Sequence, residues 1–263
     1  MAFDFEKFTE TSVAVQFDDL DFTTFQRQPL DASMLRVIRY MCDVEYHTSC
    51  YLRDLLVSPS RKKPEAAGFM TMWNREEFWH GEALAAVLRE HGIIVDYDEV
   101  KAKRVKLGWQ DALGPLKQSW PTSLIGDDFV AVHMSWGATN ELSAVAAYRR
   151  MAEMTDHPTL SPLLMRIAQQ ETRHVAFYTT QAIKKMEESD RAKQLVKLTL
   201  TKAWKPVGTS IMGDDEVRAV MGTLFEAQRK IIENLDHRVA KFPGLEGVTV
   251  FQDAFERLGV NLD

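Results

Sequence analysis

The chain has 263 residues, of which 45% are hydrophobic and 27% charged, and its formal net charge is −6. This length can bury a sizeable core, so we expect a single domain over 1–263, and the acidic balance argues against bulk nucleic-acid binding. Two cysteines (Cys42 and Cys50), no visible signal peptide and no apolar run of 18 residues favour a cytoplasmic protein with free thiols and no membrane span.

The first half of the chain predicts an arm and two long helices. Residues 1–30 carry scattered aromatic residues without a sustained period, and we expect an arm that lies over the domain. A first helix should run from the N-cap Asp31 to about Leu56, and residues 57–63 should form a basic loop. A second helix should then run from Pro64 to about His91, with Gly92 as its stop.

The second half predicts two more long helices and an extension. Residues 93–126 are rich in glycine and proline and predict a long connection with one short helix near 97–105. A third helix should run from Asp127 or Asp128 to about Met154, and a fourth should follow the Pro158 to Pro162 turn and reach about Met186. Further helices are expected at about 190–204, 214–240 and 250–258.

Two copies of one motif lie on these helices, Glu77-Phe78-Trp79-His80 and Glu171-Thr172-Arg173-His174. Residues three apart share a helix face, so each copy can direct a carboxylate and an imidazole to one point. Glu45 lies 32 residues before Glu77, Glu141 lies 30 residues before Glu171, and each interrupts an apolar stripe. A buried carboxylate without a partner costs several kcal/mol, so these glutamates are expected to be ligands.

One glutamate from each of two helices, plus Glu-x-x-His from each of two others, is typical of four-helix di-iron and di-manganese carboxylate proteins. The sequence therefore predicts an all-α, ferritin-like bundle with a long crossover, in which 1–30 is the arm, 31–188 the core and 189–263 additional helices. The predicted metal ligands are Glu45, Glu77, His80, Glu141, Glu171 and His174. Four carboxylates and two imidazoles suit two iron ions, or a mixed manganese and iron pair, better than zinc.

Other residues have weaker assignments. Glu76 is predicted to support His174, and Gln170 to support His80, because metal-bound imidazoles usually donate their second N–H to an acceptor. A solvent-facing Glu76 and an ordinary polar Gln170 are the alternatives. A substrate pocket is predicted from four residues on the ligand stripes, Trp73, Met134, Tyr148 and Tyr178. The alternative is plain core, which is the more common role of aromatic residues and Met at helical spacing. Small residues near Glu141, among them Gly137, are expected to leave room for metal or substrate.

The motifs resemble those of one family. The run from Trp73 to Leu84 resembles the second ligand helix of the soluble acyl-carrier-protein desaturases, and Glu171 to His174, with Tyr178 and Thr179, is similar to their fourth. The resemblance implies that the six residues are di-iron ligands, and it implies O2 activation, a ferredoxin-type electron donor and a homodimer. The chain is shorter than typical members, Gln170 stands where an Asp commonly occurs, and Ala144 replaces a hydroxyl residue.

The leading functional hypothesis is a desaturase acting on a carrier-bound fatty acyl chain. Related di-iron oxygenases hydroxylate or N-oxygenate other small hydrophobic substrates with the same ligands. Ferritin- or rubrerythrin-like iron or peroxide handling and a metal-free interaction module are further alternatives. An acidic acyl carrier protein is expected to dock near Arg61 to Lys63 or Lys101 to Lys106, because such clusters steer association.

Overall fold

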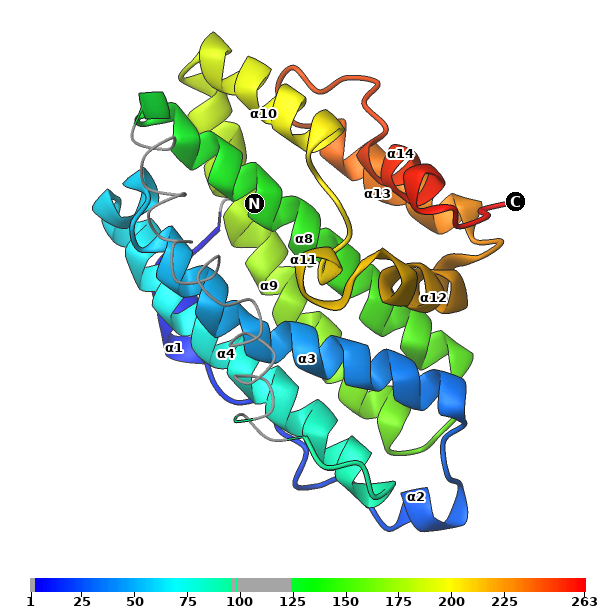
Figure 1. The fold of residues 1–263 in the computed structure, drawn as a ribbon. Coiled ribbons are helices and arrows are strands. Elements are labelled where there is room, and N and C mark those ends of the chain that lie inside the picture. Colours follow the sequence, from blue (N-terminus) through cyan, green and yellow to red (C-terminus); the bar gives the residue numbers. More distant parts are fainter. Residues whose placement is uncertain (1–2, 96–97, 99–123) are drawn as a thin grey trace. The chain divides into compact units, whose positions relative to one another are not determined.

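Helices make up the regular structure of the residues that the computed structural model describes, which are 3–95, 98 and 124–263 (Figure 1). No strand occurs in those ranges, and the all-α prediction is confirmed. Most of the expected connection 93–126, with its short helix, lies outside the described residues. The chain divides into two compact units, which are described separately below.

The first unit, called the hairpin unit, comprises 5–123 and 148–170. Its α3 (Ala32–Leu55) begins after Asp31, whose carboxylate accepts a 2.8 Å hydrogen bond from the Met34 N–H, so the predicted N-cap is confirmed. Its α4 (Pro64–Glu90) starts with proline, which needs no N–H partner there, and ends before Gly92, where φ is +73°. Both helices therefore have nearly their predicted bounds.

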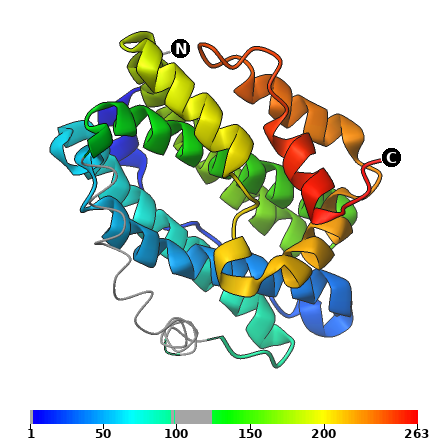
Figure 2. The same cartoon turned by 45° about the horizontal axis from the view of Figure 1, so that its top comes forward.

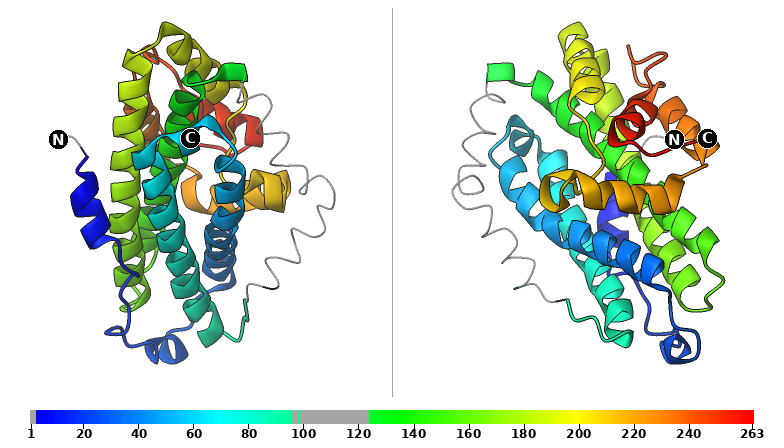
Figure 3. Two further views of the ribbon diagram at one scale, coloured as in Figure 1. Left: turned by 90° about the vertical axis from the view of Figure 1, so that its left-hand side faces the viewer. Right: turned by 45° about the vertical axis from the view of Figure 1, so that its right-hand side comes forward.

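Helices α3 and α4 run antiparallel side by side (Figure 3). They approach closely at Gly81, where an added Cβ would lie 2.9 Å from the Tyr46 ring. The segment between them contains a 3₁₀ helix, η1 (Pro59–Lys62), where only a loop was predicted. A short 3₁₀ turn is a frequent connector, and Pro59 supplies the φ that its first position requires.

From Phe5 onward the N-terminal arm also belongs to the hairpin unit. It contains two short helices that the sequence did not predict, α1 (Phe5–Thr11) and α2 (Thr24–Arg27). Phe8 packs on Phe69 of α4 with ring centroids 5.3 Å apart, and Phe25 stacks on His157 at 4.3 Å. The arm is therefore held by buried aromatic contacts at both of its short helices.

Helices α8 (Asp128–Met154) and α9 (Leu160–Glu187) form the second long pair, with bounds close to those predicted. The boundary between the units crosses both of them, after Ala147 and after Gln170. Gly137 of α8 lies against the ring of Tyr178 of α9, and Ser161 Oγ of α9 donates to the Ala152 carbonyl of α8 at 3.3 Å. These pairings show that α8 and α9 are antiparallel.

The second unit, called the C-terminal unit, comprises 1–4, 124–147 and 171–263. After α9 it contains α10 (Asp190–Lys202), α11 (Thr209–Met212), α12 (Asp214–Phe225), α13 (Arg229–Val239) and α14 (Val250–Leu258). The predicted helix 214–240 is wrong, because the chain breaks at Ala227, whose φ is +55°. Its N–H and that of Arg229 donate to the carbonyls of Asn261 and Leu262, both at 3.1 Å.

Two buried polar contacts organise the C-terminal unit, in which α13 lies beside α14 (Figure 2). Trp204 is fully buried, its indole N–H donates to Asn140 Oδ1 at 3.0 Å, and Asn140 directly precedes Glu141. The Asp236 carboxylate accepts hydrogen bonds from the backbone N–H groups of Phe251 (2.7 Å) and Gln252 (3.0 Å) at the start of α14. Among the described helices, none has the length and apolar character needed to cross a membrane.

Candidate metal centre

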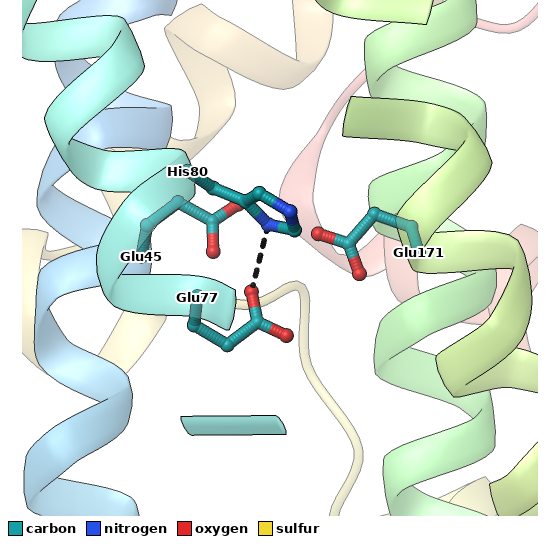
Figure 4. A group of neighbouring side chains, drawn as sticks. All are labelled: Glu45, Glu77, His80 and Glu171. Atoms are coloured by element: carbon teal, nitrogen blue, oxygen red, sulfur yellow. Dashed lines mark hydrogen bonds and ion pairs between the residues drawn. The ribbon is translucent and has the colours of Figure 1, made fainter. Parts of the chain in front are cut away.

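Three of the predicted ligands meet in the hairpin unit and are called the hairpin triad: Glu45 of α3, and Glu77 and His80 of α4. Each offers a ligand atom within 4.8 Å of those of the other two. Figure 4 shows the three side chains pointing toward one another, with the His80 Nδ1 to Glu77 Oε2 contact of 3.3 Å dashed. All three are buried, with exposed fractions of 3%, 2% and 0% in that order.

The other three predicted ligands meet in the C-terminal unit and are called the C-terminal triad: Glu141 of α8, and Glu171 and His174 of α9. Their ligand atoms also lie within 4.8 Å of one another. His174 Nδ1 is 2.9 Å from Glu171 Oε2 and 3.8 Å from Glu141 Oε2. All three are buried. Glu171 is the fourth side chain drawn in Figure 4.

The donor chemistry of each triad fits one divalent cation. Two carboxylates carry two negative charges, and a neutral imidazole adds a nitrogen donor without changing that sum. Taking such charges out of water costs several kcal/mol per ion unless a partner compensates, and a divalent cation would balance each triad. Oxygen-rich donors with one imidazole suit iron or manganese, whereas soft thiolate ligands, which are absent from the two triads, suit other ions.

Two further contacts hold the hairpin triad. The Tyr148 hydroxyl donates to Glu45 Oε1, and Tyr148 itself is fully buried on α8. Gln170 Oε1 lies 2.8 Å from His80 Nε2, which is the pair that the sequence predicted to meet. Metal-bound imidazoles usually donate their second N–H to such an acceptor. The expected contact is therefore present, and the role of Gln170 in supporting a metal ligand stays a prediction. Glu76 is fully buried in α4, and its role toward His174 also stays a prediction.

The residues predicted to line a substrate pocket, Trp73, Met134, Tyr148 and Tyr178, are all buried. The room expected beside Gly137 is not there, because a Cβ at that position would lie 2.4 Å from the Tyr178 ring. This expectation was wrong because the glycine accommodates an aromatic neighbour. The ring centroid of His133 lies 6.0 Å from that of Tyr178. Burial lowers the pKa of the His133 imidazole to about 4, so this side chain is neutral at neutral pH.

Sequence reasoning missed the hydrogen-bonding role of Tyr148 and the part played by Val13, whose carbonyl accepts from Gln170 Nε2 at 3.1 Å. Tyr148 did carry a signal, because it lies two turns after Glu141 on one stripe and has a polar end. Val13 carried none, because a backbone carbonyl has no signature in the sequence.

The predicted docking clusters are described in part. Arg61 and Lys62 of η1 are exposed, and Arg61 Nη1 donates to the carbonyls of Val57 (2.7 Å) and Ser58 (3.3 Å). The cluster from Lys101 to Lys106 lies outside the described residues. Comparison of the chain with protein-family models, with curated proteins and with solved structures gave no match.

Proposed function

We propose that the chain binds two divalent metal ions, iron foremost, through the hairpin triad and the C-terminal triad, and that it is an O2-dependent oxidoreductase. The observation that carries the proposal is that each triad gathers two buried carboxylates and an imidazole within 4.8 Å. A mixed manganese and iron pair would use the same donors.

Two contacts of the hairpin triad involve residues that lie close in the sequence to members of the C-terminal triad. Tyr148, which donates to Glu45, lies seven residues after Glu141 on α8, about 10 Å along the helix axis. Gln170, which contacts His80, immediately precedes Glu171 on α9. Both contacts lie within the hairpin unit.

The residues of the chain have distinct roles in this proposal. The four carboxylates balance the charge of two cations, and the imidazoles present Nδ1, the nitrogen that faces the carboxylates. The Tyr148 hydroxyl donates to Oε1 of Glu45 and so holds that carboxylate in place. When bound, a pair of irons supplies O2 activation with electrons from an external donor, for which the resemblance implies a ferredoxin-type protein.

For the reaction we propose desaturation of a fatty acyl chain on an acyl carrier protein, on the strength of the motif resemblance around Glu77 and Glu171. The exposed cations of η1 would attract an acidic carrier protein, and such attraction weakens as salt rises. Hydroxylation or N-oxygenation of another small hydrophobic substrate is the alternative with the same ligands. A homodimer is likewise proposed from the resemblance alone.

Metal analysis of protein loaded anaerobically with Fe(II) tests the centre. Wild type should bind about two ions per chain, as four-helix di-iron proteins do. Glu77→Ala and Glu171→Ala should each lose at least one. The exposed glutamates Glu90→Ala on α4 and Glu187→Ala on α9 are matched controls and should bind as wild type. Full metal content in both triad variants would refute the assignment.

A second experiment tests the chemistry. The reduced, iron-loaded protein should consume O2, and turnover with an acyl carrier substrate and a reductant should yield a double bond. A hydroxylated product would favour the alternative oxygenase, and rapid peroxide turnover without substrate oxidation would favour a rubrerythrin-like role. An inert reduced protein would remove the oxidoreductase proposal.

A further inference from the structure

The Gln170 side chain lies between the arm and a proposed ligand. Its Oε1 is 2.8 Å from His80 Nε2, and its Nε2 is 3.1 Å from the Val13 carbonyl oxygen. A carbonyl can only accept, so Gln170 must present its NH₂ group to Val13 and its oxygen to His80. That oxygen can only accept, so His80 must carry its ring proton on Nε2. In a neutral ring Nδ1 then carries the lone pair and faces Glu77 Oε2 at 3.3 Å, an arrangement of two acceptors that a cation bound between them would stabilise.

The opposite amide orientation shows what the arm contributes. A flipped Gln170 would place its oxygen against the Val13 carbonyl, and two acceptors would repel each other at 3.1 Å. Its NH₂ group would then face His80 Nε2, which would have to become the acceptor, and the ring proton would move to Nδ1. A protonated Nδ1 cannot bind a metal ion in the hairpin triad.

We propose that residues 12–19 of the arm, called the strap, position His80 for metal binding. The Val13 carbonyl fixes the amide of Gln170, and Gln170 fixes the ring proton of His80 on Nε2, so that Nδ1 is the metal-binding atom. The inference rests on the proposed function and deepens it, because it assigns a role in metal affinity to a segment that supplies no ligand. Val13 and Gln170 are positioning residues.

The strap is anchored on both sides of Val13. Arg75 Nη2 of α4 donates to the Ser12 carbonyl at 2.9 Å. Arg166 Nη1 of α9 donates to the Gln16 carbonyl at 2.6 Å, and the same guanidinium pairs with both oxygens of Asp19 at 2.6 and 2.7 Å. Arg166 lies one turn before Gln170, and Arg75 lies five residues before His80. The two helices that carry Gln170 and His80 therefore also hold the strap.

At Val13 itself apolar burial contributes little, because this residue is 50% exposed, whereas its neighbour Val15 is buried. Val13 contacts α9 through its carbonyl oxygen, which fixes the orientation of the Gln170 amide. The effect of the strap should therefore be visible in the ring nitrogens of His80 and separable from general stability.

The test compares Arg166→Ala in two backgrounds. Arg166→Ala releases Gln16 and Asp19 while leaving Gln170 and every proposed ligand in place. Gln170→Glu provides an acceptor for the His80 Nε2 proton in either carboxylate orientation. Its second oxygen would repel the Val13 carbonyl, so in this background the position of the ring proton no longer depends on the strap. Gln170→Leu removes the acceptor. Arg229→Ala, which breaks an exposed ion pair with Asp263 at 2.6 Å, is the matched control.

Two readouts are needed. Nitrogen NMR of metal-free protein with labelled histidine reports which ring nitrogen of His80 carries the proton, and Co²⁺ titration reports metal affinity. Wild type, Gln170→Glu and Arg229→Ala should show the Nε2 proton. Arg166→Ala and Gln170→Leu should show a mixture of both forms and weaker Co²⁺ binding, about 10-fold and up to about 100-fold respectively, the range expected for loss of such supports.

The decisive comparison is the double variant. In the Gln170→Glu background Arg166→Ala should leave both the ring proton and Co²⁺ affinity unchanged. An equal loss in both backgrounds, or no loss in the wild-type background, would overturn the strap proposal. If wild type itself binds no metal, the proposed function fails, and the ring-proton spectrum of the metal-free variants still decides the role of the strap.

Discussion

Gly137→Ala tests how tightly α8 and α9 pack beside the C-terminal triad. The new Cβ would lie 2.4 Å from Tyr178 Cε1 and 2.5 Å from Cδ1, whereas ordinary contacts begin near 3.4 Å. One of the two helices, or the ring, must move by about 1 Å. Tyr178 is only 1% exposed, so the ring has no solvent space to enter.

The expected cost follows from two opposing effects. Overpacking a tight site costs about 1–3 kcal/mol, and a contact this short belongs at the upper end. Replacing glycine by alanine inside a helix returns about 1 kcal/mol. We therefore expect a net loss of about 2 kcal/mol in the free energy of unfolding. Co²⁺ or Fe(II) affinity should fall as well, because Glu141 lies one turn after Gly137 and His174 one turn before Tyr178.

Urea unfolding of the metal-free protein measures the change, and Gly222→Ala is the matched control. Gly222 lies in α12, and nothing is within 4 Å of a Cβ built there, so this variant should gain about 0.5–1 kcal/mol. Opposite signs for the two glycines are the prediction. Gly137→Ala as stable as Gly222→Ala would refute the packing argument.

Tyr148→Phe removes a hydrogen bond to the buried Glu45 carboxylate, and urea unfolding should show a loss of about 1.5–3 kcal/mol; unchanged stability would contradict that bond. Burial lowers the pKa of His133 from its ordinary value of 6.5 to about 4. The free energy of unfolding is therefore highest above pH 6.5 and falls as the pH drops toward 4, because the unfolded chain binds the proton first. That loss is about 3 kcal/mol, and unfolding of His133→Phe should lack this part of the acid dependence. Asp236→Ala removes the cap of α14 and should cost at least about 2 kcal/mol, with Asp236→Asn costing less; equal losses would argue against the cap.

The helix bounds that local chemistry decides could be predicted. Asp31 as an N-cap, Pro64 in a first turn and Gly92 as a stop each act within a few residues, so the sequence around them was sufficient. The break at Ala227 could not be predicted, because no glycine or proline marks it. It depends on backbone hydrogen bonds to Asn261 and Leu262, more than 30 residues away.

The same distinction applies to the candidate site. The gathering of each triad followed from helical spacing, and the Gln170 contact with His80 followed from Gln170 preceding Glu171. The position of Tyr148 on the stripe of Glu141 predicts that its side chain faces inward, toward a pocket. It does not predict that the hydroxyl donates to Glu45 on another helix. The strap was beyond prediction, because Val13 acts through its backbone and the arm has no period that would place it.

The contact between Trp204 and Asn140 limits how far this chain can be reduced. A designer who wanted a minimal bundle would cut after residue 188 and keep every proposed ligand. That cut would remove the indole that fixes Asn140, the neighbour of Glu141, together with Phe251, whose ring centroid lies 4.8 Å from that of Trp204. The C-terminal helices thus support α8 at Asn140, and a shorter version would need a new partner for that side chain before the C-terminal triad could be expected to keep its geometry.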